Sequence, residues 1–320
     1  MIERLDITQW RDYDREHPAP TFFARPAWAL AIAEVYPSYM PTLLRVHVRG
    51  AQPVLVPMLE HRERTLRLRR FSGFPLGGYT CFLHHDGSQA SQRECDLALR
   101  EISGFAHSAK IVPWPLGPTP SAPGREHLTA VVDLSGGIEA ALEGVDGCFR
   151  RMAGQAARRG VTCAPSYGSE AVETYYDLLR ESAKRWGIPE PVERRALIDA
   201  LVRHGGDDVE IWFARAEGRA IAGGIVFYGG QEFFFWSAAM LGEFSRLRPS
   251  NALNFALLHA AAQRGMQWYN LGSSEGLPGV ARFKKDLGAR EVAYREIDLA
   301  RLPVRVARTV RNALNRRLTG

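Results

Sequence analysis

The sequence lacks the features of a membrane or exported protein. No run of about 18 apolar residues occurs in it, which is the length that a membrane-spanning helix requires. Its first ten residues, MIERLDITQW, contain no apolar segment typical of a signal peptide. These two absences predict a cytoplasmic protein without a transmembrane segment.

Cysteine is scarce, and its spacing carries no motif. The four cysteines are Cys81, Cys95, Cys148 and Cys163, and no two of them form a CxxC pair or another pattern typical of metal ligands. We therefore expect reduced thiols, most of them buried as small side chains, and no bound metal.

Acidic residues are outnumbered by basic ones. The chain has 41 Lys and Arg against 35 Asp and Glu, a formal charge of +6, which favours an anionic partner such as RNA, a nucleotide or an acidic lipid. Residues 301–320 contain several arginines and no acidic residue. Their apolar positions (Val304, Val306, Val310) recur at helical spacing, so we expect a basic helix here. It would pack on the first half of the chain and offer arginines to tRNA, touch an anionic membrane surface, or remain solvated.

Hydrophobic patterning predicts the same order of elements twice. In each half, helical segments precede or follow runs of alternating polar and apolar residues typical of antiparallel strands. The second half adds a helix over 251–265, a strand over 266–272 and a last strand over 291–299. This order predicts an α/β protein with mixed sheets and a duplicated domain, divided at residues 137 and 138.

The segment from Tyr269 to Ala289, YNLGSSEGLPGVARFKKDLGA, joins a short apolar run to a glycine-rich loop and a basic cluster. Together with the preceding helix PSNALNFALLHAAAQRG and the basic segment FRRMAGQAARRGV (149–161), it resembles the Fem-type (FemABX-like) transferases of the GNAT superfamily. That resemblance implies GNAT-like domains over 1–137 and 138–300, with the chemistry in the second. It also implies transfer of an aminoacyl group from aminoacyl-tRNA to an amine. The family's lysine after phenylalanine, at the reaction cleft, matches Lys284.

Two features of the family are missing. The segment KRWGIPEPVERRAL (184–197) shows no Arg-x-x-x-Tyr pattern, and no long helical arm is inserted between helices. The acceptor therefore stays open between a small amine and an amino-sugar-linked peptide.

Acyl transfer to an amine requires an uncharged nucleophile and donors directed at the developing oxyanion. The glycines Gly272, Gly276 and Gly279 allow close approach of backbone N–H groups, and Lys284 can stabilise an oxyanion or hold a phosphate. Glu275 is the nearest carboxylate able to accept the proton of the attacking amine. Since no Ser-His-Asp or Cys-His arrangement is evident, we expect direct attack without an acyl-enzyme. The expected substrate-binding residues are Tyr269, Ser273, Ser274, Arg282, Phe283, Lys285 and Trp236.

The donor site is expected before the helix over 251–265. GNAT proteins that use CoA carry a glycine-rich Q/R-x-x-G-x-G/A stretch here, whose amides hold the pyrophosphate. This chain has RLRPSN instead, and its Pro249 removes one N–H group, which argues against CoA. We predict donor contacts from Arg246, Arg248, Ser250 and Asn251, and Ser250 or Asn251 would also cap the helix.

Two other functions remain in competition with aminoacyl transfer from tRNA. The first is transfer from acyl-CoA or an acyl carrier to an amino sugar or another small amine. The second is a non-catalytic GNAT pair that binds RNA or assists assembly. In each case the acyl donor is a co-substrate, and no bound cofactor is expected.

Overall fold

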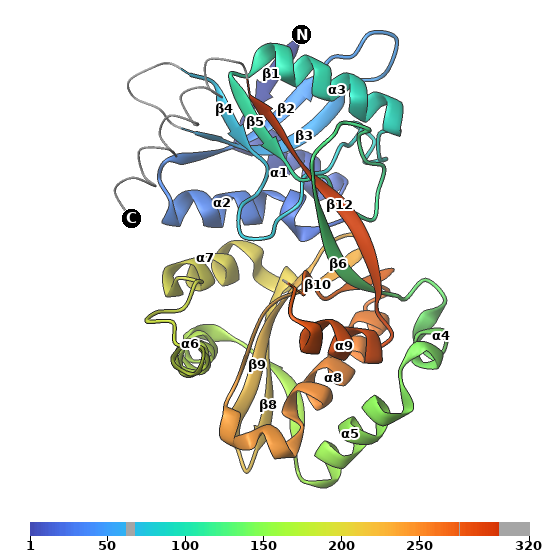
Figure 1. Ribbon diagram of the computed structural model, residues 1–320. Helices are drawn as coiled ribbons and strands as arrows, with labels where there is room; N and C mark the ends of the chain where they lie inside the picture. The colour runs from blue at the N-terminus through green and yellow to red at the C-terminus, as the bar shows by residue number, and fades with distance from the viewer. Residues whose placement is uncertain (62–67, 275, 301–320) are drawn as a thin grey trace, which may run out of the picture. The chain divides into compact units, whose positions relative to one another are not determined.

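The structure is a computed structural model that describes residues 1–61, 68–274 and 276–300. Internal contacts divide the chain into two compact units, each built around its own part of a β-sheet (Figure 1). The first unit comprises Met1–Pro18, Tyr36–His127 and the described residues from Tyr294 onward, and the second comprises Ala19–Val35 and Leu128–Ala293.

The sheet of the first unit has the strand order β1-β2-β3-β4-β5-β12. Neighbouring strands run antiparallel except β4 and β5, which are parallel. Helix α3 packs against β1, β2, β3 and β5. The bounds are β1 Ile2–Leu5, α1 Ile7–Glu16, β2 Tyr39–Val46, β3 Val54–His61, β4 Arg70–Ser72, α3 Gln92–Phe105, β5 Ser108–Ile111 and β12 Arg290–Ala300.

Helix α3 shows how local sequence shapes this unit. Ser91 caps the helix: its side chain accepts a hydrogen bond from the Glu94 amide, while the Glu94 carboxylate accepts one from the Ser91 amide. The buried face of the helix repeats at helical spacing, with Cys95, Leu99 and Ile102 in the core. The helix ends at Phe105, and the chain then turns into β5.

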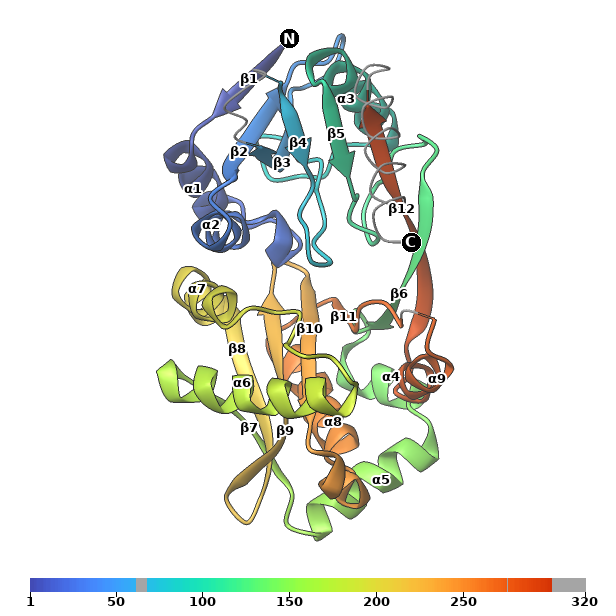
Figure 2. The same ribbon diagram turned by 60° about the vertical axis from the view of Figure 1, so that its left-hand side comes forward.

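The sheet of the second unit has the order β6-β11-β10-β9-β8-β7, antiparallel except for the pair β10 and β11. Helix α6 covers one face and α8 the other (Figure 2). The strands are β6 Arg125–Asp133, β7 Thr162–Ser166, β8 Val209–Ala216, β9 Arg219–Tyr228, β10 Glu232–Met240 and β11 Trp268–Asn270. The helices are α2 Pro26–Val35, α4 Gly137–Gly144, α5 Gly147–Arg158, α6 Gly168–Arg185, α7 Arg195–Gly205, α8 Pro249–Gln263 and α9 Pro278–Asp286, with short 3-10 helices at η1 Phe22–Ala24, η2 Gly206–Asp208 and η3 Gly242–Leu247.

Residues 19–35 belong to the second unit although they lie near the start of the chain. Phe22 stacks on Phe227 at 4.7 Å between ring centroids, and Trp28 contacts both Phe227 and Trp236 at 5.7 Å. Phe22, Trp28 and Phe227 are buried, and their contacts remove apolar surface from water, which stabilises the arrangement. The expected division at residues 137 and 138 places this segment in the other domain. The predicted C-terminal helix over 301–320 lies outside the described residues.

A buried carboxylate anchors the start of β8. Glu210 is 3% exposed and accepts hydrogen bonds from Tyr167, Trp212, Tyr228 and Arg264. The Arg264 guanidinium also lies over the Tyr228 ring, 3.9 Å from its centroid. A buried carboxylate destabilises the fold unless hydrogen-bond donors compensate its charge, and these four groups supply the donors.

Glu210→Gln is expected to lower the free energy of unfolding by about 2 kcal/mol, because the new amide N–H₂ faces a group that only donates, Arg264 on one side or Trp212 on the other. Urea denaturation followed by circular dichroism measures the change. Glu217→Gln, on the exposed turn between β8 and β9, is the matched control and should change the stability by less than about 0.5 kcal/mol. Equal stabilities for the two variants would contradict a role of Glu210 as an anchor.

Candidate functional site

The second unit contains a pocket where two neighbouring strands separate. Strands β10 and β11 pair in parallel only over Glu232–Phe234 and Trp268–Asn270, and β10 then continues to Met240 beyond the end of β11. The carboxyl ends of parallel strands are a common place for ligands in α/β folds. A pocket of about 460 Å³ opens at this point, lined by Phe235, Trp236, Ser237, Ala238, Ser250, Asn254, Leu271, Gly279, Val280, Phe283 and Lys284.

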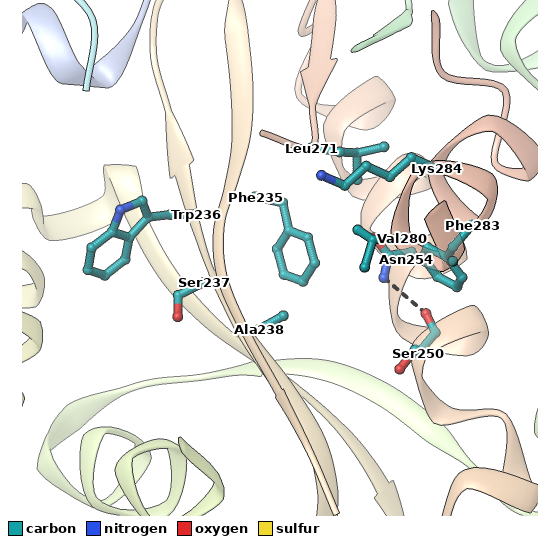
Figure 3. A pocket seen from close by; sticks show the side chains of 11 residues that line it. Phe235, Trp236, Ser237, Ala238, Ser250, Asn254, Leu271, Val280, Phe283 and Lys284 are labelled. Carbon is teal, nitrogen blue, oxygen red and sulfur yellow. Dashed lines mark hydrogen bonds between the residues drawn. The ribbon is translucent and has the colours of Figure 1, made fainter. Parts of the chain in front are cut away.

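A β-bulge distributes the β10 residues around this pocket. The pairing register between β9 and β10 shifts between Phe235 and Ser237. As Figure 3 shows, Phe235 therefore points to the side of β10 that carries Lys284, and Ser237 to the opposite side. The Phe235 ring fits against Gly224 of β9, where an added Cβ would lie only 2.1 Å from a ring carbon. Glycine at this position lets the ring form the pocket wall.

Lys284 places a cation in the pocket wall. It lies on α9, is 8% exposed, and its Nζ donates hydrogen bonds to the carbonyl oxygens of Gly272 at 3.0 Å and Ser273 at 2.8 Å. These carbonyls follow β11, so the loop after that strand holds the ammonium in place. Its neighbours in the wall are mainly apolar, which strengthens the electrostatic effect of the charge on a bound group.

The loop that holds Lys284 is itself fixed by a buried amide. The Asn270 side-chain oxygen accepts hydrogen bonds from the Gly272 amide at 2.9 Å and from Thr129 Oγ1 at 2.6 Å. Its Nδ2 donates to Glu232 Oε1 at 2.7 Å. Asn270 was not among the predicted site residues, although an Asn two residues before a Gly is a pattern that favours such a turn.

The floor of the pocket comes from α8. Asn254 donates to the Ser250 carbonyl at 3.0 Å and accepts a hydrogen bond from the Tyr269 hydroxyl at 2.9 Å. Asn254 was also missed by the sequence analysis. The sequence signal that could have pointed to Asn254 is a polar residue among the apolar positions of NALNFALL.

The predicted substrate-binding residues separate into four groups. Phe283 lines the pocket together with Lys284, whereas Trp236 lines it from the opposite side of β10 (Figure 3). Tyr269 is fully buried and reaches the pocket only through Asn254. Ser273 and Ser274 border a neighbouring cavity of about 210 Å³, and Arg282 and Lys285 are exposed. Glu275 lies outside the described residues.

The prediction for the start of α8 needs a correction. The helix begins at Pro249, and the residue that caps it is Arg248, whose φ of 57° is left-handed. Ser250 and Asn251 lie inside the first turn, so neither is the predicted cap. Proline is suited to the first helical position, and this explains why the helix starts there rather than later. Ser250 lines the pocket, and Asn251 is buried.

The predicted donor arginines lie on the surface beside this helix start. Arg246 and Arg248 are exposed, and the Arg246 carbonyl accepts a hydrogen bond from Arg159 at 2.6 Å. Arg159 follows α5, which packs against α8. The exposed arginines of α5 and its C-terminus extend the basic surface, and they are Arg150, Arg151, Arg158 and Arg159.

No group of three or more His, Cys, Asp or Glu in the described part of the chain is arranged to hold a metal ion. None of the described helices is long and apolar enough to cross a membrane.

The chain matches known proteins in sequence and in fold. Residues 145–285 match the family model of an acetyltransferase (GNAT) domain. The fold is similar to that of FemX, with a TM-score of 0.70 and 12% identity over 94% of this chain and 97% of that chain. No curated protein matches the sequence.

Two other solved structures share the fold at lower scores. A tandem GNAT protein from the clavulanic acid biosynthesis pathway has a TM-score of 0.52 and 11% identity, over 94% of this chain and 99% of that chain. L-PGS from Bacillus licheniformis has a TM-score of 0.50 and 12% identity, over 97% of both chains. At these identities the likeness concerns the fold alone, and it confirms the predicted α/β class with tandem GNAT-like architecture.

Proposed function

We propose that this chain, which carries a GNAT acyltransferase domain in its second unit, transfers an aminoacyl group from aminoacyl-tRNA to an amine. The observation that carries the proposal is the pocket between β10 and β11, where the Lys284 ammonium lies in a wall that is otherwise mainly apolar. An ester carbonyl bound there would develop negative charge beside a fixed cation as the amine attacks. Placing charge in advance where it develops is a principal means of catalysis.

The reaction needs no acyl-enzyme. The amine nitrogen forms a bond to the acyl carbon, the ester bond to the carrier breaks, and the leaving oxygen takes up a proton. Among the pocket-lining residues that the structure describes, none is a cysteine, and the hydroxyls of Ser237 and Ser250 contact Tyr175, Glu193 and Met240 rather than a histidine. Direct attack of the amine on the acyl group is therefore the simplest mechanism for this pocket.

The surface beside the start of α8 supports a polyanionic donor. Pro249 has no N–H group to offer a pyrophosphate, and Arg248 adopts the left-handed conformation in front of it. The exposed arginines Arg246, Arg248 and Arg159 extend this surface onto α5. A row of arginines suits the phosphates of an RNA strand. The Fem-type resemblance points to the same class of donor.

Acyl-CoA is the second candidate donor. It is favoured by the match of residues 145–285 to a family described as acetyltransferases. In that reaction the same Lys284 would stabilise the carbonyl oxygen of a thioester.

The two donors are separated by supplying the purified protein with charged tRNA or with acyl-CoA, each with a panel of amines. We expect N-aminoacyl products from charged tRNA, abolished by ribonuclease. At tRNA concentrations below saturation, the rate should fall at least about tenfold between about 50 and 200 mM salt, because phosphate contacts release counterions. Mass spectrometry of the products shows which donor supplied the transferred group. Transfer from the thioester alone would reject the tRNA donor.

A further inference from the structure

Ser237 links the pocket to a carboxylate on the opposite side of β10. Its hydroxyl oxygen lies 2.8 Å from the Tyr175 hydroxyl and 3.0 Å from Glu193 Oε1. Tyr175 belongs to α6, and Glu193 lies in the segment that connects α6 to α7. Ser237 lines the same pocket as Lys284, and Figure 3 shows the two side chains on opposite sides of the strand.

The direction of the hydrogen bonds in this network is fixed. Tyr175 is completely buried, and burial raises its pKa well above the usual range, so it stays protonated and donates to Ser237 Oγ. An ionised carboxylate only accepts, so the Ser237 proton is directed at Glu193. A serine oxygen has two lone pairs, of which Tyr175 uses one. The second lone pair is used by neither Tyr175 nor Glu193.

We propose that the acceptor amine binds at Ser237 and that Ser237 passes its proton to Glu193. This inference rests on the proposed acyl transfer and adds the acceptor side of the reaction to it. A primary amine is ammonium at neutral pH and must lose a proton before it can attack. Glu193 is the carboxylate that a described pocket-lining hydroxyl reaches, and the relay therefore gives the site a base.

The proton transfer balances as follows. The ammonium gives one proton to Ser237 Oγ while the Ser237 hydroxyl proton moves to Glu193 Oε1, so Ser237 ends as a neutral hydroxyl and Glu193 as a carboxylic acid. The freed nitrogen lone pair forms the bond to the acyl carbon, and the ester bond breaks. A second nitrogen proton goes to the leaving oxygen, which becomes a hydroxyl. Glu193 then releases its proton to water.

The segment that carries Glu193 also indicates the character of the acceptor. Trp186, Ile188 and Val192 on this segment are exposed by 57%, 38% and 69%. Exposed large apolar side chains beside a proposed amine site favour an amine that is attached to an apolar group. We therefore expect such amines to be better acceptors than equally basic amines without one.

The relay is tested by the dependence of transfer on the basicity of the acceptor. Wild-type protein, Glu193→Gln and Ser237→Ala are compared at one neutral pH with a strongly basic alkylamine and with a weakly basic amine that is already uncharged. We expect Glu193→Gln to slow transfer to the alkylamine by about 100-fold and to the weakly basic amine by less than about threefold. Ser237→Ala should likewise slow transfer to the alkylamine more than transfer to the weakly basic amine. Glu190→Gln, an exposed neighbour on the same segment, is the matched control and should leave both rates unchanged.

The ratio of the two rates is measured within one variant, so partial misfolding cancels. An equal loss with both amines, or no loss with either, would overturn the relay while the proposed acyl transfer stands. A wild-type protein that transfers nothing from either donor would instead reject the acyl transfer and the relay with it.

Discussion

Lys284→Met is expected to lower kcat/KM for acyl transfer by about 100- to 1000-fold. Methionine keeps an unbranched stem against the pocket wall but removes the ammonium, which the proposed reaction places beside the reacting carbonyl. The loss should fall mainly on kcat, because the charge matters most when the oxyanion has formed. Steady-state kinetics with the better of the two donors measure it.

Two controls separate chemistry from stability. Lys284→Met also leaves the carbonyls of Gly272 and Ser273 without their donor, which costs about 1 to 3 kcal/mol of folding free energy, so thermal unfolding must show that the variant is folded in the assay. Lys285→Met changes the exposed neighbouring lysine and should retain nearly full activity. Unchanged turnover in folded Lys284→Met would favour a non-catalytic role for the pocket.

The protein is expected to lose stability steeply as the pH rises above about 10. Besides the exposed Tyr167, burial raises the pKa of five tyrosines above the usual value, most strongly for the fully buried Tyr175 and Tyr269. In the unfolded chain these hydroxyls ionise near pH 10, whereas in the folded protein they remain protonated. The unfolded state therefore binds fewer protons above that pH, and the free energy of unfolding falls. The other three tyrosines are Tyr13, Tyr228 and Tyr294.

A tyrosine that stays protonated in the folded protein contributes up to about 1.4 kcal/mol per pH unit well above the unfolded pKa, so Tyr175 and Tyr269 alone contribute up to about 3 kcal/mol per unit. Urea denaturation at a series of pH values from about 8 to 11 measures the slope, and tyrosinate absorbance should appear together with unfolding. Tyr269→Phe removes one ionising group and should reduce the slope by up to about 1.4 kcal/mol per pH unit. A denaturation midpoint that stays constant to pH 11 or so would show that the buried hydroxyls do not control alkaline stability.

Much of the second unit could be predicted because its elements are locally encoded. The hairpins β8-β9 and β9-β10 follow from alternating apolar residues and glycine-containing turns, and α8 follows from the helical spacing in NALNFALLHAAAQ. The segment after β11 stands out in the sequence by its glycines and its basic cluster, and the structure places Lys284 of that segment in a pocket wall.

Other features depend on contacts between distant residues. Phe22 and Trp28 belong to the second unit because they pack against the apolar ring of Phe227. No local sequence pattern predicts this contact. The hydrogen bond between Ser237 and Glu193 spans 44 positions, and it exists because a single-residue bulge turns Ser237 to that side of β10. Since a shift of one residue reverses every side chain of a strand, such a placement is invisible to periodicity.

The sequence by itself therefore determined the class of fold, the order of the elements and the segment that holds the basic cluster. These properties come from apolar periodicity and turn chemistry, which act over a few residues. Tertiary structure alone decided that Lys284 is buried, that Ser237 and Phe235 lie on opposite sides of one strand, and that Glu193 reaches Ser237. Each of these depends on strand register and on packing between elements far apart in the chain, where the free energy of burial rather than local propensity selects the partner.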